Sequence, residues 1–338
     1  MKPPLEIIGG GLAGLSLGLA LHRAGVPVTL FEAGDYPRHR VCGEFISGLS
    51  AATMARLGLA PLLADALRHR EVAWFIGGHA PRLQRLPAPA LGLSRHVLDA
   101  RLAEAFQAEG GDLRKGTRVT ELAPRPGRVF ATGRRRGRSP WLGLKIHAVD
   151  LPLKRELEVH LGAQAYVGLA RVEDNRVNIC GLFRRRELSA RGADLLIAYL
   201  GAAALGSLAS RIRAATTDPA SFCAVAAVSF DRSVPDFDRV TLGDTCAMIP
   251  PFTGNGMAMA FQSAELALDP LIAYVHGKSG WPDVCRAIHQ AQGRRFRLRL
   301  ASAHLLHPWL LQPARQHWLA ALNRAHLLPF RPLYAALH

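Results

Sequence analysis

A glycine-rich segment near the start of the chain has the spacing of a nucleotide-binding turn. The run from Leu5 through Gly9 and Gly11 to Gly14 leads into an Ala/Leu-rich helical pattern. Gly9 permits a tight turn, Gly11 lets backbone N–H groups approach a pyrophosphate, and Gly14 lets the helix pack close to the strand. The phosphates would lie at the helix N-terminus, where N–H groups lack partners. These features predict the first half of a dinucleotide-binding βαβ unit.

The second strand of this unit is Val28-Thr-Leu-Phe, and it ends in Glu32. A carboxylate at this place accepts hydrogen bonds from the hydroxyls of the adenosine ribose. It would repel a phosphate on that ribose. We therefore expect a nucleotide without a 2′-phosphate, and not NADP, in this pocket.

Two residues outside the nucleotide-binding unit, Cys42 and His147, could donate or accept a proton. Cys42 lies in the turn-rich stretch that includes Arg38, Arg40 and Glu44. Its thiol could give a proton to a substrate carbon, although a lone cysteine is more often a small buried side chain. His147 lies in a β-prone run and could act as a general acid or base near neutral pH. The alternative for His147 is a hydrogen-bonded histidine within a sheet.

A third stretch combines glycines, prolines and an acid at the start of a helical pattern. A strand ends in Gly243-Asp244, a loop follows through Pro250 and Pro251, and Gly254-Asn255-Gly256-Met257 opens the helix. Such a helix end can hold an anionic group. Asp244 is predicted to contact a cofactor, with a turn or cap role as the alternative.

The elements that would position these residues indicate an α/β fold in which one domain interrupts another. A Ser start signal precedes a helical pattern over 94–106, and β-prone pieces cover 118–122 and 128–131. Antiparallel strands are predicted over 145–149, 157–161, 165–170 and 177–183, and a helix over 194–214. The predicted nucleotide domain comprises 1–71, 94–140 and 223–275, the inserted substrate domain 72–93 and 141–222, and a C-terminal helical region 276–338.

Composition excludes several classes. The length of 338 residues suits about two domains of ordinary size. Five cysteines without a CxxC pair and 14 scattered histidines argue against disulfides and against a metal site. The net charge of +16 comes with 7% aromatic residues and no nucleic-acid motif, so nucleic acid is not an expected partner. No signal peptide or spanning segment is recognised, and a cytoplasmic location is expected.

In these three motifs the chain resembles FAD-dependent oxidoreductases of the aromatic-hydroxylase superfamily, and more closely their geranylgeranyl-reductase-like branch. The resemblance covers roughly residues 5–270. It implies a Rossmann-like FAD-binding domain of the glutathione-reductase type, an inserted antiparallel β-sheet for the substrate, and FAD as the cofactor. The halogenase motif Trp-x-Trp-x-Ile-Pro and the reductase signature Tyr-x-Trp-x-Phe-Pro are absent, so neither of those activities follows directly.

The resemblance also implies the residues that hold FAD. Arg38 and Arg95 would lie near the phosphates, Asp244 at the ribityl chain, and Gly254 and Gly256 around the flavin ring. Ala-Thr-Gly stands where many hydroxylases have Asp-Gly, which weakens the assignment of Gly133. The full predicted cofactor set is Gly9, Gly11, Gly14, Glu32, Arg38, Arg40, Arg95, Gly133, Asp244, Pro251, Gly254, Asn255, Gly256 and Met257, with Cys42 and His147 as candidate catalytic residues.

Several functions remain open at this level. The first is hydride transfer between flavin and a carbon–carbon double bond of a hydrophobic, isoprenoid- or polyketide-like substrate. The second is monooxygenation of an aromatic or polyketide-like substrate by a flavin C4a-peroxide, and the third is a flavin- or lipid-binding protein without turnover. NAD(P)H or an electron-donor protein would supply electrons. The basic C-terminal helices predict peripheral contact with a membrane, or else packing against the protein's own core.

Overall fold

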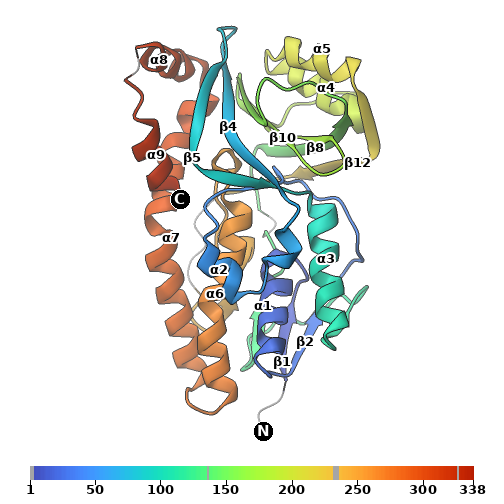
Figure 1. Ribbon diagram of the computed structural model, residues 1–338, viewed down its shortest axis with the longest axis vertical. Helices are drawn as coiled ribbons and strands as arrows, with labels where there is room; N and C mark the ends of the chain where they lie inside the picture. The colour runs from blue at the N-terminus through green and yellow to red at the C-terminus, as the bar shows by residue number, and fades with distance from the viewer. Residues whose placement is uncertain (1–3, 135–136, 231–235, 326) are drawn as a thin grey trace.

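Two β-sheets and a long C-terminal helix organise the chain (Figure 1). The computed structural model describes residues 4–134, 137–230, 236–325 and 327–338. The smaller sheet lies near the N-terminus, the larger sheet lies at the opposite end, and helix α7 (Trp281–Leu311) runs along the side of the molecule. The candidate site residues come from the loops between these layers.

The smaller sheet is parallel and buried, as expected for a nucleotide domain. Its strand order is β13-β7-β1-β2-β6. Leu5 and Ile7 on the central strand are fully buried, and helices α1 and α3 pack against each other beside the sheet. The bounds are β1 Leu5–Ile8, α1 Leu12–Arg23, β2 Val28–Phe31, α3 Arg95–Ala108, β6 Asp112–Arg114, β7 Arg128–Phe130 and β13 Val240–Thr241.

The larger sheet is antiparallel except where β4 pairs with β9. Its order is β12-β8-β11-β10-β9-β4-β5-β3. One face packs its apolar side chains against helices α4 and α5. The bounds are β3 Phe45–Ile46, β4 Leu67–Ile76, β5 Arg82–Gly92, β8 Trp141–Val149, β9 Leu157–Gly162, β10 Ala165–Arg171, β11 Arg176–Arg184, α4 Gly192–Ala202, α5 Gly206–Ala214 and β12 Thr216–Ala226.

Strand β8 has apolar side chains on one face and polar side chains on the other. Leu144 and Ile146 belong to the core under α4 and α5. Successive side chains of a strand point to opposite faces, so Lys145 and His147 lie on the other side. Both are fully or almost fully buried. A buried lysine and histidine on one face require partners, and a loop of the nucleotide domain supplies them.

The C-terminal region is helical, as predicted. Helix α6 (Gly256–Val275) packs against α1, and α7 packs against α6 and α9. Among the described residues, no helix combines the length and apolar character needed to cross a bilayer. The remaining elements are α2 Ala51–Arg56, α8 Pro313–Arg324, α9 Phe330–Leu337 and the short 3-10 turns η1 Pro61–Leu63, η2 Gly243–Thr245 and η3 Pro251–Thr253.

The predicted fold class is confirmed, with local differences. Residues 118–122 are not a strand: they are mostly exposed, and no strand of either sheet pairs with them. The helix predicted over 194–214 is two helices, separated at Ala204, whose φ of 60° ends the first. The larger sheet also includes β3, residues 67–71 of β4 and residues 223–226 of β12.

We expect Gly14→Ala to destabilise the fold. A Cβ at Gly14 would lie 2.0 Å from the Gly9 carbonyl oxygen, so helix α1 would have to move away from the strand. Overpacking of this kind costs about 1–3 kcal/mol. Gly201→Ala in α4 is the matched control, because nothing lies within 4 Å of its Cβ position. Urea unfolding should show a loss only for Gly14→Ala, and equal stability of the two variants would contradict the prediction.

Candidate cofactor and active site

The glycine turn after β1 has the geometry that its three glycines predict. Gly9 has φ +112°, and a Cβ there would lie 2.2 Å from the Ala131 carbonyl oxygen. Helix α1 begins directly after Gly11, and no side chain caps its N-terminus. The nearest atom to a Cβ on Gly11 would be Arg95 Nη2 at 3.9 Å. The turn therefore has no room for a side chain at Gly9 or Gly14, but it leaves space beside Gly11.

Glu32 lies at the end of β2 and is bound to the glycine turn. Its carboxylate accepts hydrogen bonds of 2.8 Å each from the backbone N–H groups of Gly10 and Gly34. Arg38 donates to the same carboxylate at 3.0 Å. Burial would raise the pKa of Glu32, but these N–H groups and the charge of Arg38 lower it. Arg38 thus lies at the predicted ribose end and not beside Arg95.

Arg95 and Arg40 share the buried carboxylate of Asp99. Arg95 donates two hydrogen bonds to it, at 2.7 and 2.8 Å, and Arg40 Nε donates one at 2.9 Å. Asp99 is fully buried. The shared carboxylate holds the two guanidinium groups together, and that of Arg95 lies beside Gly11 at the open turn.

Asp244 joins this cluster from the far end of the nucleotide domain. Asp244 has an exposed surface, but many protein atoms surround its carboxyl group. The resulting desolvation raises its pKa, and the positive charges of Arg95, Arg134 and Arg40 act in the opposite direction. Thr245 donates to the Gly133 carbonyl oxygen at 2.9 Å. The structure therefore brings Arg40, Arg95, Gly133 and Asp244 together from separate parts of the sequence.

The Pro-rich loop and the start of α6 form the next part of the predicted cofactor site. Gly254 has φ +69°, and a Cβ there would lie 2.1 Å from the ring of Phe45. Nothing lies within 4 Å of a Cβ on Gly256, where α6 begins without a side-chain cap. Met257 is buried in the core of the nucleotide domain, so its side chain contributes packing. Pro251 opens the short turn η3 that precedes Gly254.

These residues fit FAD. Two atoms of the predicted cofactor set, Arg40 Nη2 and Asn255 Oδ1, are buried without a hydrogen-bond partner among the described residues. The first suits a phosphate oxygen and the second suits an N–H donor. Gly11 leaves room for a diphosphate beside the uncapped end of α1. Together with Glu32 and Asp244, the set offers partners for each polar part of the cofactor.

Cys42 lies between the arginine cluster and the larger sheet. Its carbonyl oxygen accepts a 2.9 Å hydrogen bond from Asn178 Nδ2 on β11. Burial raises the pKa of its thiol, and Arg95 and Asp244 are both close enough to influence it. The thiol is therefore neutral at physiological pH and can act as a proton donor.

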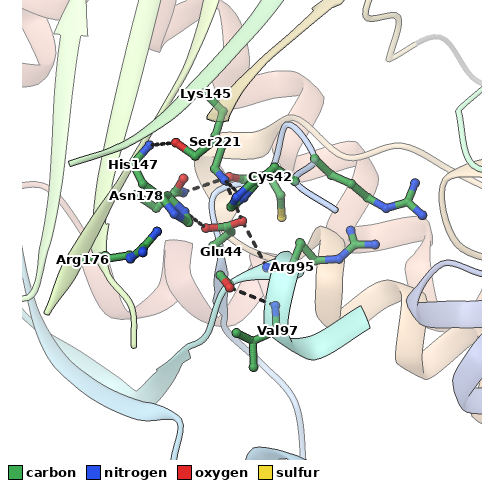
Figure 2. Close-up of polar contacts among 12 residues, drawn as sticks. Cys42, Glu44, Arg95, Val97, Lys145, His147, Arg176, Asn178 and Ser221 are labelled. Carbon is green, nitrogen blue, oxygen red and sulfur yellow. Dashed lines mark hydrogen bonds and ion pairs between the residues drawn. The ribbon is translucent and has the colours of Figure 1, made fainter. Parts of the chain in front are cut away.

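Glu44, two residues further on, is the centre of a buried polar cluster (Figure 2). Its Oε2 lies 2.5 Å from His147 Nε2, and its Oε1 lies 3.3 Å from Lys145 Nζ. The same Oε1 accepts a 3.1 Å hydrogen bond from the backbone N–H of Arg95. Burial would raise the pKa of Glu44, but His147 and Lys145 lower it. The carboxylate therefore links the cofactor loop, helix α3 and the larger sheet.

Lys145 and His147 each make one further contact with a residue other than Glu44. Lys145 Nζ donates to His39 Nδ1 at 3.0 Å, and burial and the Lys145 charge lower the pKa of His39 to about 4. The backbone N–H of His147 donates to Ser221 Oγ at 2.7 Å. His147 Nδ1 is buried without a hydrogen-bond partner among the described residues. That nitrogen can hold or release a proton for a ligand.

Glu44 and Lys145 have no role in the sequence-based prediction, yet they hold His147 in place. A signal was present: Lys145 and His147 stand two positions apart in an otherwise apolar strand, which puts both on one face. The identity of their partner could not be read in the same way, because Glu44 is far from them in sequence. Arg134 and Thr245, beside Asp244, belong to no recognisable motif.

A cavity of about 610 Å³ lies between the start of β8 and helix α7. Trp141, Phe230, His304 and His307 are among its lining residues. His307 stacks on Phe252 of the Pro-rich loop with ring centroids 6.2 Å apart, and burial lowers its pKa to about 4. The cavity is therefore aromatic, and one of its walls backs onto the loop before Gly254.

Comparisons with known proteins agree with this geometry. Residues 3–140 match the family described as an FAD binding domain. The chain is 28% identical over 125 residues to menaquinone reductase of Mycolicibacterium smegmatis, covering 36% of this chain and 31% of that protein. It is 31% identical over 148 residues to 3-amino-4-hydroxybenzoate 2-monooxygenase PtmB3 of Streptomyces platensis, covering 39% and 36%. The alignments thus span about a third of these curated relatives.

Two solved structures share the fold over nearly the whole chain. PqsL of Pseudomonas aeruginosa, described as a probable FAD-dependent monooxygenase, superposes with a TM-score of 0.70 at 16% identity and covers 94% of this chain and 99% of its own. A geranylgeranyl bacteriochlorophyll reductase-like protein from Thermoplasma acidophilum gives 0.71 at 14% identity, covering 94% and 90%. At these identities the likeness concerns the fold.

We expect Gly11→Ala to weaken FAD binding without destabilising the protein. The added methyl group meets no atom closer than 3.9 Å in the structure, but it would occupy the space through which the diphosphate approaches the backbone. A loss of about tenfold or more in affinity is expected, which corresponds to about 1.4 kcal/mol. Titration of the apoprotein with FAD, followed by flavin fluorescence, measures the effect. An unchanged dissociation constant would argue against a cofactor at this turn.

We expect Glu44→Gln to lower the free energy of unfolding by about 3–5 kcal/mol at pH 7, because Lys145 would be left buried without its counter-ion. The pKa of Glu44 is below its ordinary value of 4.5, so its contribution is complete above that pH and is lost as the pH falls through the lower folded value. The difference between wild type and variant should therefore narrow in acid.

Urea unfolding at pH 7 and at pH 4 tests this expectation. Glu104→Gln on the exposed side of α3 is the matched control and should have little effect at either pH. A difference between Glu44→Gln and wild type that grows in acid would refute the proposed ionised state.

Proposed function

We propose that the chain, whose residues 3–140 match the FAD binding domain family, is an FAD-dependent oxidoreductase related to the aromatic hydroxylases and reductases of that superfamily. Its reaction is hydride transfer between flavin and a carbon–carbon double bond of a hydrophobic substrate. When bound, FAD accepts or gives a hydride, and in reduced form it also reacts with oxygen. NAD(P)H or an electron-donor protein supplies the electrons.

In this proposal the cofactor is bound by the residues of the candidate cofactor site. Gly11 and the N-terminus of α1 bind the diphosphate, with Arg95 and Arg40 beside it. Glu32 binds the adenosine ribose, and Asp244 binds the ribityl chain. Gly254, Asn255 and Gly256 surround the flavin ring, where the uncapped end of α6 favours negative charge.

The observation that carries this proposal is the neutral thiol of Cys42 between the arginine cluster and the substrate sheet. Reduction of a double bond adds a hydride to one carbon and a proton to the other, so a proton donor must lie near the ring. A thiol with a raised pKa keeps its proton until a strongly basic carbon develops. Cys42 is in place to give that proton.

His147 is the second proton carrier. Glu44 binds its Nε2 and so fixes the ring, which leaves Nδ1 free toward a ligand. Lys145 lies 3.3 Å from the Glu44 carboxylate, and its charge helps to lower the pKa of Glu44. In this arrangement Glu44 and Lys145 are positioning residues, and His147 either donates a proton to the substrate or returns one to Cys42.

The aromatic cavity beside α7 supports a hydrophobic substrate. It has the size of a small-molecule site, and Trp141 and Phe230 suit a planar or isoprenoid body. A relative named menaquinone reductase is consistent with such a substrate. Its alignment covers 31% of that protein, so the substrate assignment depends on the cavity.

Monooxygenation is the second candidate. The relative PtmB3 is named as a monooxygenase of an aminohydroxybenzoate, and it is 31% identical to this chain over the aligned region. The arginine cluster around Cys42 would suit an acidic aromatic substrate. The two reactions differ in whether the reduced protein needs oxygen to turn over its substrate.

Rapid mixing distinguishes the two reactions. The FAD-loaded protein is reduced without oxygen, mixed with oxygenated buffer and followed by absorbance. We expect slow, single-step reoxidation if hydride transfer to carbon is the reaction. An additional absorbing species before the oxidised spectrum would instead assign monooxygenation, and a protein that binds no FAD would refute both.

We expect Cys42→Ala to slow turnover by about 100-fold or more, the usual contribution of a positioned proton donor. FAD binding and the rate of flavin reduction should stay close to wild type. Cys285→Ala in α7, distant from the loop, is the matched control. A Cys42→Ala protein with unchanged turnover and pH profile would assign the proton to His147, and His147→Gln would then carry the loss.

A further inference from the structure

The C-terminal region has an unusual charge distribution. From residue 284 to the end of the sequence there are eight arginines and no lysine, aspartate or glutamate. Seven of the eight are exposed, and Arg299 is buried. The eight are Arg286, Arg294, Arg295, Arg297, Arg299, Arg315, Arg324 and Arg331. The exposed surface of this region is therefore strongly basic.

Helix α7 exposes apolar side chains within this basic region. Leu298 is 68% exposed and Leu305 is 72% exposed. Ala301, also exposed, lies three residues after the first and four before the second, so the three share one face of the helix. Arg294 is one turn before Leu298 on the same face. We call Arg294, Leu298, Ala301 and Leu305 the α7 stripe.

The opposite side of α7 packs on the protein. Phe296, Ala303, Leu310 and Leu311 are buried. One side of the helix therefore belongs to the core, and the α7 stripe faces outward. The exposure of two leucines is not a consequence of a loosely packed helix.

The α7 stripe meets the aromatic cavity at Ala301. Ala301, His304 and Pro308 of α7 line the cavity, together with Trp141 and Phe230. Leu298 and Leu305 lie on either side of Ala301 along the helix. The exposed leucines thus flank the helix edge of the cavity.

We propose that the α7 stripe and its arginines dock on the surface of a membrane that contains anionic lipids, with Leu298 and Leu305 inserted among the acyl chains. Arginines bind lipid phosphates while leucines enter the interface, which is the usual composition of an interfacial helix. The net charge of +16 opposes pairing with a second copy of the chain and favours an anionic surface.

Trp318 and Leu327 extend the apolar exposure beyond α7. They are 67% and 68% exposed, and α8, which carries Trp318, packs against α7 (Figure 1). Tryptophan is enriched at the boundary between lipid and water. The proposal also places the cavity edge at the bilayer, so that a hydrophobic substrate could enter without crossing water; that part rests on the proposed function.

Vesicle sedimentation tests the docking. The full-length FAD-loaded protein is mixed with vesicles of phosphatidylcholine alone or with one third phosphatidylglycerol, and the bound fraction is measured. We expect binding to the anionic vesicles that weakens with added salt, and much weaker binding to phosphatidylcholine. Equal binding to both compositions, or none to either, would overturn the proposal.

Two double variants separate the contributions of charge and apolar surface. Arg294→Gln with Arg297→Gln should weaken binding by about 30-fold, given the usual contribution of each basic side chain near an anionic surface. Leu298→Gln with Leu305→Gln should weaken it by about tenfold or more. The matched controls are Arg68→Gln with Arg70→Gln on β4, and Leu83→Gln with Leu188→Gln, all exposed elsewhere.

The controls should bind like wild type, and controls that weaken binding as much as the α7 variants would refute a specific surface. Thermal unfolding confirms that each variant is folded, and size-exclusion chromatography detects self-association through the stripe, which would contradict the proposal. Because sedimentation needs no substrate, a protein that binds vesicles but shows no turnover would refute the proposed function alone.

Discussion

The carboxylate of Glu44 is the interaction on which the arrangement of this protein depends. It is fully buried, and burial of an unpaired charge is strongly unfavourable. Its partners come from two elements: Lys145 and His147 on β8 of the larger sheet and the backbone N–H of Arg95 at the start of α3. Moving the sheet relative to the cofactor loop would break these contacts together. The two domains are therefore held in one relative position by an electrostatic requirement.

Arg95 connects that requirement to the cofactor. Its backbone binds Glu44, while its side chain binds Asp99 and lies beside Gly11. The same few residues thus set the position of the diphosphate turn, the Cys42 loop and the histidine of the sheet. A buried network of this kind is useful only when it is completely satisfied. Among the buried atoms without a hydrogen-bond partner in the described residues, His147 Nδ1 and Asn255 Oδ1 belong to predicted site residues.

The basic residues of the interior and those of the C-terminal surface differ in whether they have acidic partners. Asp99 and Glu44 neutralise arginine and lysine inside the protein, whereas the sequence after Asp283, which pairs with Arg286, contains no acid. The exposed arginines of α7 and α8 beyond Arg286 therefore have no acid close to them in the sequence. The aromatic cavity is lined on one side by α7, whose His307 stacks on Phe252 of the Pro-rich loop.

The sequence by itself determined the local features. The glycine spacing, the acid after β2 and the alternation of β8 depend on short-range geometry, so the nucleotide unit, the antiparallel sheet and the helical C-terminus could all be predicted. Residues 118–122 could not be, because β propensity does not say whether a neighbouring strand is available. Only the tertiary structure decided that Arg38 binds Glu32 and that Glu44 binds His147 and Lys145. Such pairings join residues distant in the chain, and many acids and bases could have met; burial selects the pairs that leave no charge unpaired.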